Sequence, residues 1–118
     1  MPSRRLSAIV IDCQCDDLAE AARFWSAALD TPVVTLDQDG DGKYAELASA
    51  PGQPHVLLQK VEHASRVHLD IETDDLDAEV LRHEQCGAMR VAFVRQRWWV
   101  MQAPSGHRYC LVKRPAGR

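Results

Sequence analysis

Three side chains suited to proton transfer lie on two similar segments of this sequence. Residues 10–18 read VIDCQCDDL and residues 68–76 read HLDIETDDL, so Asp12 and Asp70 hold equivalent places, and His68 stands where the first segment has a valine. A histidine titrates near neutral pH, and two carboxylates held close together can share one proton. His68, Asp12 and Asp70 are therefore the candidate catalytic residues. The alternatives are that each aspartate caps a backbone group or binds an arginine, and that His68 is hydrogen-bonded without doing chemistry.

The strands that carry these residues are predicted from their alternation. Residues 7–15 (SAIVIDCQC) and 66–73 (RVHLDIET) alternate as half-buried strands do. The sides expected to pack against a helix carry Ile9, Ile11, Cys13 and Cys15 in the first strand, and Val67, Leu69, Ile71 and Thr73 in the second. The opposite sides carry Val10, Asp12 and Gln14, and His68, Asp70 and Glu72.

A helix is predicted after each strand, with an aspartate as its N-cap. The first helix places its apolar residues at spacings of three and four, namely Leu18, Ala21, Ala22, Trp25, Ala28 and Leu29. The second repeats the plan with Leu76, Val80 and Leu81, and Gly87 is suited to end it.

Three strands are predicted after each helix. In the first half they are Pro32–Leu36, Lys43–Ala48 and His55–Val61, and in the second half Met89–Val94, Arg97–Gln102 and Arg108–Lys113. A polar hairpin turn over residues 37–42 separates the first two. The fold class is therefore α+β, with one domain over residues 1–118 built from a β-α-β-β-β module at 7–61 and a second at 66–113.

The polar sides of the two leading strands are expected to line a shared concave surface. They would bring together Asp12, Gln14, His68, Asp70 and Glu72. Burying that many polar groups without partners costs several kcal/mol, so the surface is expected to be a solvated cleft. A cleft between two similar halves suits a small organic molecule.

The composition excludes several classes of partner. A chain of 118 residues with net charge −3 and a pI near 5.9 has no excess of cations for nucleic acid. No apolar run is long enough to cross a membrane, and the apolar stretch near the N-terminus carries Asp12, which favours a strand over a signal peptide. The expected location is the cytoplasm, with all four cysteines reduced and no CxxC pair among them.

Three segments together resemble the vicinal oxygen chelate superfamily, which groups glyoxalases, bleomycin-resistance proteins and extradiol dioxygenases. They are IDCQCDDLAEAARFWSAAL, RVHLDIETDDLDAEVLRHEQCGA and WWVMQAPSGHRYCLV, and the resemblance to short glyoxalase-like domains covers nearly the whole chain. It implies a half-barrel cup formed by the two modules, and a homodimer. It does not fix the reaction, because this fold carries lyases, isomerases, dioxygenases and non-catalytic drug binders.

The resemblance also indicates where a metal would be held. Enzymes of the superfamily bind a divalent ion with one residue from each of four strands, typically His, Glu, His and Glu. The matching positions here are Val10, Gln59 (or Leu58 if the register slips), His68 and Cys110. Hard ions prefer carboxylates, which this set lacks, so no metal is expected. If one binds, His68, Cys110 and Gln59 are the candidates, and a softer ion such as Zn²⁺ would need a further donor, Asp12 or Asp70.

Cys110 and the adjacent tryptophans complete the candidate site. Cys110 beside His68 would resemble a nucleophile and its base, although a cysteine is often a small buried apolar residue. Trp98 and Trp99 must point to opposite faces of one strand, so one can stack on a flat ligand while the other packs elsewhere. Gln14, Gln59, Glu72, Trp98, Trp99 and Cys110 are the candidate ligand-binding residues.

Three functions remain open from the sequence. The first is recognition of a small organic molecule in the cup without the usual metal set. The second is a lyase, isomerase or dioxygenase with an altered metal site. The third is non-catalytic sequestration of a drug, in which a tryptophan stacks on a cationic compound and Asp12, Asp70 and Glu72 supply negative charge.

Overall fold

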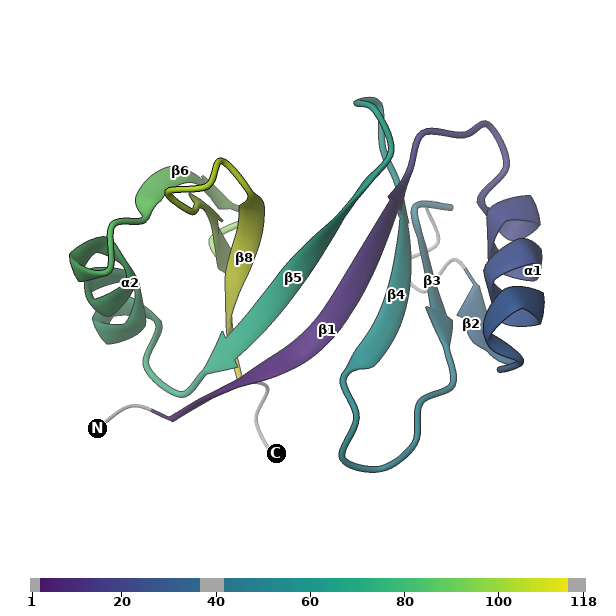
Figure 1. Ribbon diagram of the computed structural model, residues 1–118, viewed down its shortest axis with the longest axis horizontal. Coiled ribbons are helices and arrows are strands. Elements are labelled where there is room, and N and C mark those ends of the chain that lie inside the picture. The colour runs from purple at the N-terminus through teal and green to yellow at the C-terminus, as the bar shows by residue number, and fades with distance from the viewer. Residues whose placement is uncertain (1–2, 37–41, 115–118) are drawn as a thin grey trace. The chain divides into compact units, whose positions relative to one another are not determined.

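The computed structural model describes residues 3–36 and 42–114. These residues divide into two compact units: a first unit of residues 8–67, and a second unit that combines residues 3–7 with 68–114. The element order is β-α-β-β-β twice, which confirms the predicted fold (Figure 1). The predicted turn at 37–42 lies almost wholly outside the described residues. No helix of the described chain has the length and apolar character needed to cross a membrane.

The first unit has one helix against four strands. Its elements are β1 (Arg4–Cys13, from residue 8 on), α1 (Leu18–Leu29), β2 (Val33–Leu36), β3 (Tyr44–Leu47) and β4 (His55–Lys60). The strand order is β2-β3-β4-β1, and the β1–β4 pair is parallel with Asp12 opposite Gln59. The prediction of these three later strands is confirmed to within one residue at each end.

The core of the first unit lies between α1 and its strands. Asp17 starts the helix as predicted, because its carboxylate accepts a hydrogen bond from the backbone N–H of Ala19 at 3.0 Å. The buried cluster consists of Cys13, Leu18, Ala22, Ala45, Leu47 and Leu58, with Ile11, Cys15 and Trp25 packed against it. The predicted inward side of β1 is therefore confirmed for Ile11, Cys13 and Cys15.

The apolar stripe of α1 ends earlier than predicted. Ala28 and Leu29 are exposed, whereas the buried residues of the helix, Leu18 and Ala22, are in its first two turns. None of the residues of the last turn of α1 belongs to the buried cluster or packs against it.

The second unit repeats this arrangement. Its elements are β5 (Arg66–Thr73), α2 (Leu76–Gln85), β6 (Met89–Val94), β7 (Trp98–Gln102) and β8 (Arg108–Lys113), and residues 3–7 belong with them. The strand order is β5-β8-β7-β6, and β5 pairs in parallel with β8. The helix ends at the predicted place, where Gly87 has φ +105°.

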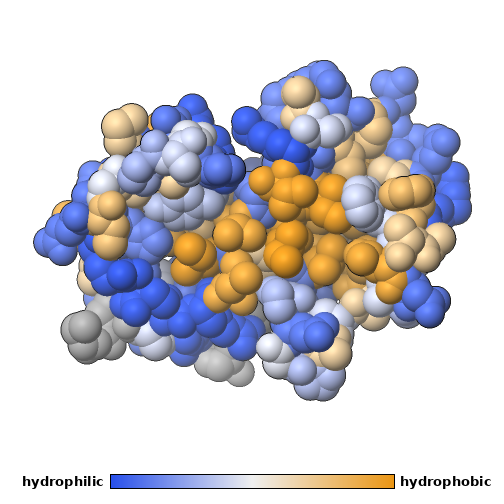
Figure 2. Space-filling view, in the orientation of Figure 1, coloured by the Kyte–Doolittle hydropathy of each residue, from blue (hydrophilic) through white to orange (hydrophobic). Residues whose placement is uncertain are grey.

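The core of the second unit corrects two predictions. Val80, Ala88, Met101 and Leu111 are buried, and Ile71, Leu76, Trp99 and Tyr109 pack against them. Leu81 is 55% exposed, because it follows Val80 by 100° around the helix and faces away from the sheet. Val67 and Leu69 are also exposed, and Figure 2 shows apolar side chains on the surface over β5. The core reaches β5 only at its Ile71 end.

A buried glutamate on α2 was not predicted. Glu79 is 0% exposed, and its carboxylate accepts hydrogen bonds from Arg4 Nε at 2.7 Å and Arg82 Nη2 at 2.9 Å. His83 Nε2 lies 3.1 Å from the same carboxylate, and His83 Nδ1 lies 2.8 Å from the Tyr109 hydroxyl. Burial raises the pKa of Glu79, but the hydrogen bonds from Arg82, Arg4 and His83 outweigh it and lower that pKa to about 2. Glu79 therefore links the N-terminal segment to α2 as an ionised group.

We expect Glu79→Gln to destabilise the protein, because the change removes the counter-charge of Arg4 and Arg82 at a buried position. The two arginine side chains are 34% and 39% exposed, so water partly compensates them, and we expect a loss of about 1.5–3 kcal/mol, the value of a hydrogen bond to a charged group. The measurement is the free energy of unfolding in urea. Glu84→Gln is the matched control, since Glu84 forms an exposed ion pair with Arg90 at 3.0 Å, and such pairs contribute about 0–1 kcal/mol. Equal losses in both variants would contradict the role given to Glu79.

The same carboxylate gives stability a defined pH dependence. The folded-state pKa of Glu79 is about 2, below its ordinary value of 4.5, so its contribution is complete above about pH 4.5 and is lost as the pH falls through 2. We expect Glu79→Gln to show a shallower loss of stability over this interval than the wild type. Urea unfolding at a series of acidic pH values measures both slopes, and parallel slopes would show that Glu79 does not set this dependence.

Candidate functional site

Three potential donor groups converge on the face of the second unit that is turned away from α2. His68 and Asp70 are two residues apart on β5, so they point to the same side, and Cys110 lies directly opposite Asp70 on β8. One donor atom from each side chain lies within 4.8 Å of those of the other two. His68 Nε2 is 3.4 Å from Asp70 Oδ1, and all three residues are partly buried. The pairing of β5 with β8 therefore assembles an imidazole, a carboxylate and a thiol in one place.

Asp70 has an unsatisfied oxygen in this cluster. Its Oδ1 is buried and accepts no hydrogen bond from the described residues, because His68 is near enough for an ion pair but is not placed to donate a hydrogen bond. A buried carboxylate oxygen without a donor is costly. A metal ion or a ligand's N–H or O–H group at this position would satisfy it.

The structure settles which tryptophan shares this face. Trp99 lies opposite Leu111 and packs against the core on the α2 side, where it stacks on Phe93 with ring centroids 5.0 Å apart. The guanidinium of Arg90 lies 5.1 Å from the same ring. Trp98 lies on the other face. It is two residues before Val100 on β7 and so points to the same side, and Val100 is opposite Cys110. Trp98 is therefore the tryptophan available to the cluster.

Glu72 does not lie in a solvated cleft, contrary to the prediction. It is 2% exposed and forms an ion pair with Nε of Arg5, while Arg114 Nε lies 3.9 Å from the same carboxylate oxygen. Two arginines compensate the charge, which is how a buried carboxylate is normally tolerated. Glu72 therefore holds the N-terminal segment to β5 through its ion pair with Arg5.

Asp12 is likewise buried rather than solvated. It is 3% exposed, and Arg66 Nε lies 3.9 Å from its carboxylate. This contact agrees with the alternative given by the sequence, in which the aspartate binds an arginine.

The other polar candidates of the first unit also bind protein groups. Gln14 is exposed, and its amide donates to the carbonyl of Glu62 at 2.8 Å. The Gln59 amide donates to the hydroxyl of Tyr44 at 3.1 Å. Since Leu58 is fully buried in the core, Gln59 and not Leu58 occupies the candidate position on β4.

The residues at the four inherited positions do not fit a hard divalent cation. Val10 is 2% exposed and carries no donor atom, and the amide of Gln59 is already used. His68, Asp70 and Cys110 supply instead one nitrogen, one oxygen and one sulfur donor, a set suited to Zn²⁺ or another softer ion. Of the two aspartates that the sequence left open as a further donor, Asp70 is the one that lies with His68 and Cys110.

The family comparison agrees with this architecture. The chain matches the model of the glyoxalase-like domain over residues 8–112. A comparison with curated proteins found no significant match.

Several solved structures are similar to this one. A hypothetical protein from Bacillus halodurans has a TM-score of 0.72 and 13% identity, with 98% of each chain covered. Methylmalonyl-CoA epimerase from Mycobacterium tuberculosis has a TM-score of 0.65 and 20% identity, covering 93% of this chain and 87% of that one. A glyoxalase/bleomycin resistance protein/dioxygenase superfamily member from Vibrio splendidus has a TM-score of 0.60 and 15% identity, covering 95% of this chain and all of that one. At these identities the likeness shows the fold and not the reaction. The family match over residues 8–112 establishes that the chain belongs to the glyoxalase-like domain family.

Proposed function

We propose that this protein binds a small organic molecule on the face of the second unit that carries His68, Asp70 and Cys110. The observation that supports this most is the convergence of the three donor groups within 4.8 Å. Val100 and Trp98 extend the same face with apolar and aromatic surface. A few polar groups set in an apolar surface are the usual composition of a ligand site.

The cluster suits a ligand with a carbonyl or carboxylate group. The imidazole of His68 can donate a hydrogen bond to such an oxygen, and its Nε2 lies 3.4 Å from Oδ1 of Asp70. The buried Oδ1 of Asp70 can accept an N–H or O–H group of the same molecule. Methylmalonyl-CoA, named with one structural relative, contains a carboxylate beside a thioester carbonyl and is a reasonable first probe.

Sequestration of a cationic drug receives less support. That function would draw on the negative charges of Asp12, Asp70 and Glu72. Asp12 lies beside Arg66, and Glu72 forms an ion pair with Arg5, so two of the three charges are compensated within the protein.

We expect saturable quenching of tryptophan fluorescence when a ligand binds this face. The titration starts with methylmalonyl-CoA and continues through other acyl-CoA thioesters and 2-oxo acids. Trp98→Phe should lose most of the signal, whereas the matched control Trp25→Phe should keep it, because Trp25 packs in the core of the first unit. His68→Ala should weaken binding at least tenfold, the effect of losing about 1.5–3 kcal/mol from a hydrogen bond to a charged group. Full quenching in Trp98→Phe, or no binding by any of these compounds, would contradict the proposal.

A second candidate function is a zinc-type centre, favoured by the donor set itself. Three protein ligands from His, Asp and Cys would leave a fourth position for water or substrate, the pattern of catalytic zinc sites. Such an ion would polarise a carbonyl or activate water, and it would satisfy Oδ1 of Asp70. The resulting activity would be that of a lyase or isomerase with an altered metal site.

Cobalt binding tests this centre without any substrate. We expect titration with Co²⁺ to produce a thiolate-to-cobalt charge-transfer band in the near ultraviolet, because Cys110 would supply the sulfur ligand. Cys110→Ser should abolish the band and His68→Ala should weaken binding. Cys86→Ser is the control, since Cys86 is an exposed thiol on the other side of the unit, at the end of α2. A band that persists in Cys110→Ser would exclude this site.

A further inference from the structure

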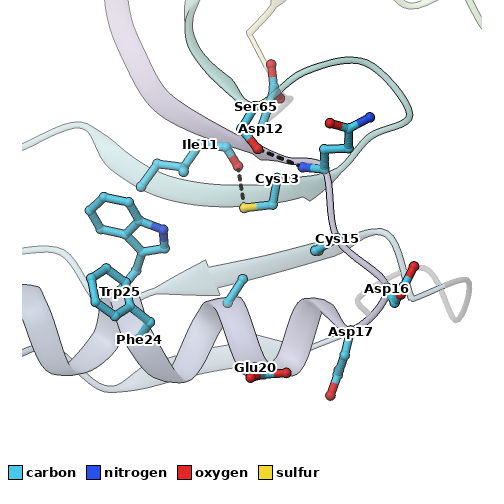
Figure 3. Close-up of a pocket in the computed structure, with 12 residues that line it drawn as sticks. Ile11, Asp12, Cys13, Cys15, Asp16, Asp17, Glu20, Phe24, Trp25 and Ser65 are labelled. Carbon is cyan, nitrogen blue, oxygen red and sulfur yellow. Dashed lines mark hydrogen bonds between the residues drawn. The ribbon is translucent and has the colours of Figure 1, made fainter.

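The first unit has a cavity of its own, with none of the residues of the proposed site in its lining. It has a volume of about 550 Å³, is open to solvent along the exposed residues Asp16, Asp17, Glu20 and Phe24, and lies between the end of β1 and α1 as far as Trp25, with Ser65 at its edge (Figure 3). A volume of this size is in the range that holds small ligands. The cavity combines an aromatic end with an acidic end, and these two features identify the class of ligand.

The aromatic end is formed by two neighbouring residues of α1. Figure 3 shows Phe24 and Trp25 together at one end of the cavity. Their rings pack edge to face with centroids 5.1 Å apart, and Phe24 is 62% exposed although it is large and apolar. Ile11 and Ala21 add aliphatic wall beside them. A flat apolar group placed here would cover part of Phe24 and contact Trp25.

The acidic end is formed by the residues at the start of α1. Asp16, Asp17 and Glu20 line the cavity, and none of its described lining residues is basic. The carboxylate of Asp17 is used as the helix N-cap, so it offsets the positive end of the helix dipole. The carboxylates of Asp16 and Glu20 have no partner among the described residues. Figure 3 shows Asp16 at the far side from the aromatic pair and Glu20 between them, one helical turn before Phe24.

One cation lies near this end but does not neutralise it. Lys60 Nζ donates a hydrogen bond to the backbone carbonyl of Asp16 at 3.1 Å, whereas the lining at this end carries the three carboxylates of Asp16, Asp17 and Glu20. The cavity therefore keeps an excess of negative charge. An anion would be repelled, and a neutral ligand would gain nothing from the charge.

We infer that this cavity binds a small organic cation whose ring lies against Phe24 and Trp25 and whose ammonium group faces Asp16 and Glu20. The ligand class is thus a primary or substituted amine carried on an aromatic or alicyclic group. Charge complementarity selects the ammonium group, and the exposed aromatic pair selects the ring. This site does not depend on His68, Asp70 or Cys110.

Binding of 2-phenylethylamine tests the inference directly. The full chain, labelled with ¹⁵N, is titrated at neutral pH, and backbone amide shifts are followed for residues 11–25. The controls are 2-phenylethanol, which has the same ring and chain but no charge, and 3-phenylpropionate, which is an anion. We expect the amine to shift amides at the end of β1 and in α1, and the alcohol and the acid to bind at least fivefold more weakly.

Charge variants then locate the ammonium group. Asp16→Asn combined with Glu20→Gln should weaken binding of the amine about tenfold, as expected for the loss of two partly exposed ion pairs. Asp30→Asn is the matched control, because it removes an acid from the other end of the same helix and should leave the affinity unchanged. Equal affinity for the alcohol, an unchanged affinity in the double variant, or shifts confined to the amides near His68 and Cys110 would each overturn the inference. None of these outcomes bears on the thioester and cobalt titrations of the second unit.

Discussion

The parallel pairing of β5 with β8 is the constraint on which both the core and the candidate site of the second unit depend. The register places Asp70 opposite Cys110 and Ile71 opposite Leu111. Because strand side chains alternate, the register that buries Leu111 under α2 also presents Cys110 on the other face beside His68. A slip of one residue would place a thiol in the core and a leucine among the polar groups. The hydrophobic effect thus selects the register, and the chemistry follows from it.

Arginines determine which carboxylates of the second unit remain available. The N-terminal segment supplies Arg4 to Glu79 and Arg5 to Glu72, and both glutamates are almost completely buried. In each pair the arginine offsets the free-energy cost of burying an ionised carboxylate. Asp70 lies close to a histidine and keeps one buried oxygen without a hydrogen bond. Glu72 and Glu79, which are bound by arginines, stabilise the fold, whereas Asp70 is suited to a ligand.

The repeat and the alternation were sufficient to predict the order of elements, the N-cap at Asp17 and the inward side of β1, because these depend on local pattern. Glu79 was missed because an acid is normally assigned to solvent, although it lies on the stripe of Leu76, Val80 and His83. One of its partners, Arg4, lies 75 residues away in sequence, and the periodicity of α2 does not indicate such a contact. Adjacent tryptophans must face opposite ways, but only the strand register decided that Trp99 is the one in the core.

The two units share one arrangement of strands but carry different side chains at matching positions. In the first unit Asp12 lies opposite Gln59 on a parallel strand, as Asp70 lies opposite Cys110 in the second. At the position of His68, however, the first unit has a buried valine. Its aspartate lies beside an arginine, and the amide of Gln59 bonds to a tyrosine, so these polar groups are occupied within the protein. The same pairing geometry therefore carries polar groups that bind one another in the first unit, and an imidazole, a carboxylate and a thiol within 4.8 Å in the second. Since the strand pairing is shared, the difference comes from the side chains at two positions, where Val10 corresponds to His68 and Gln59 to Cys110.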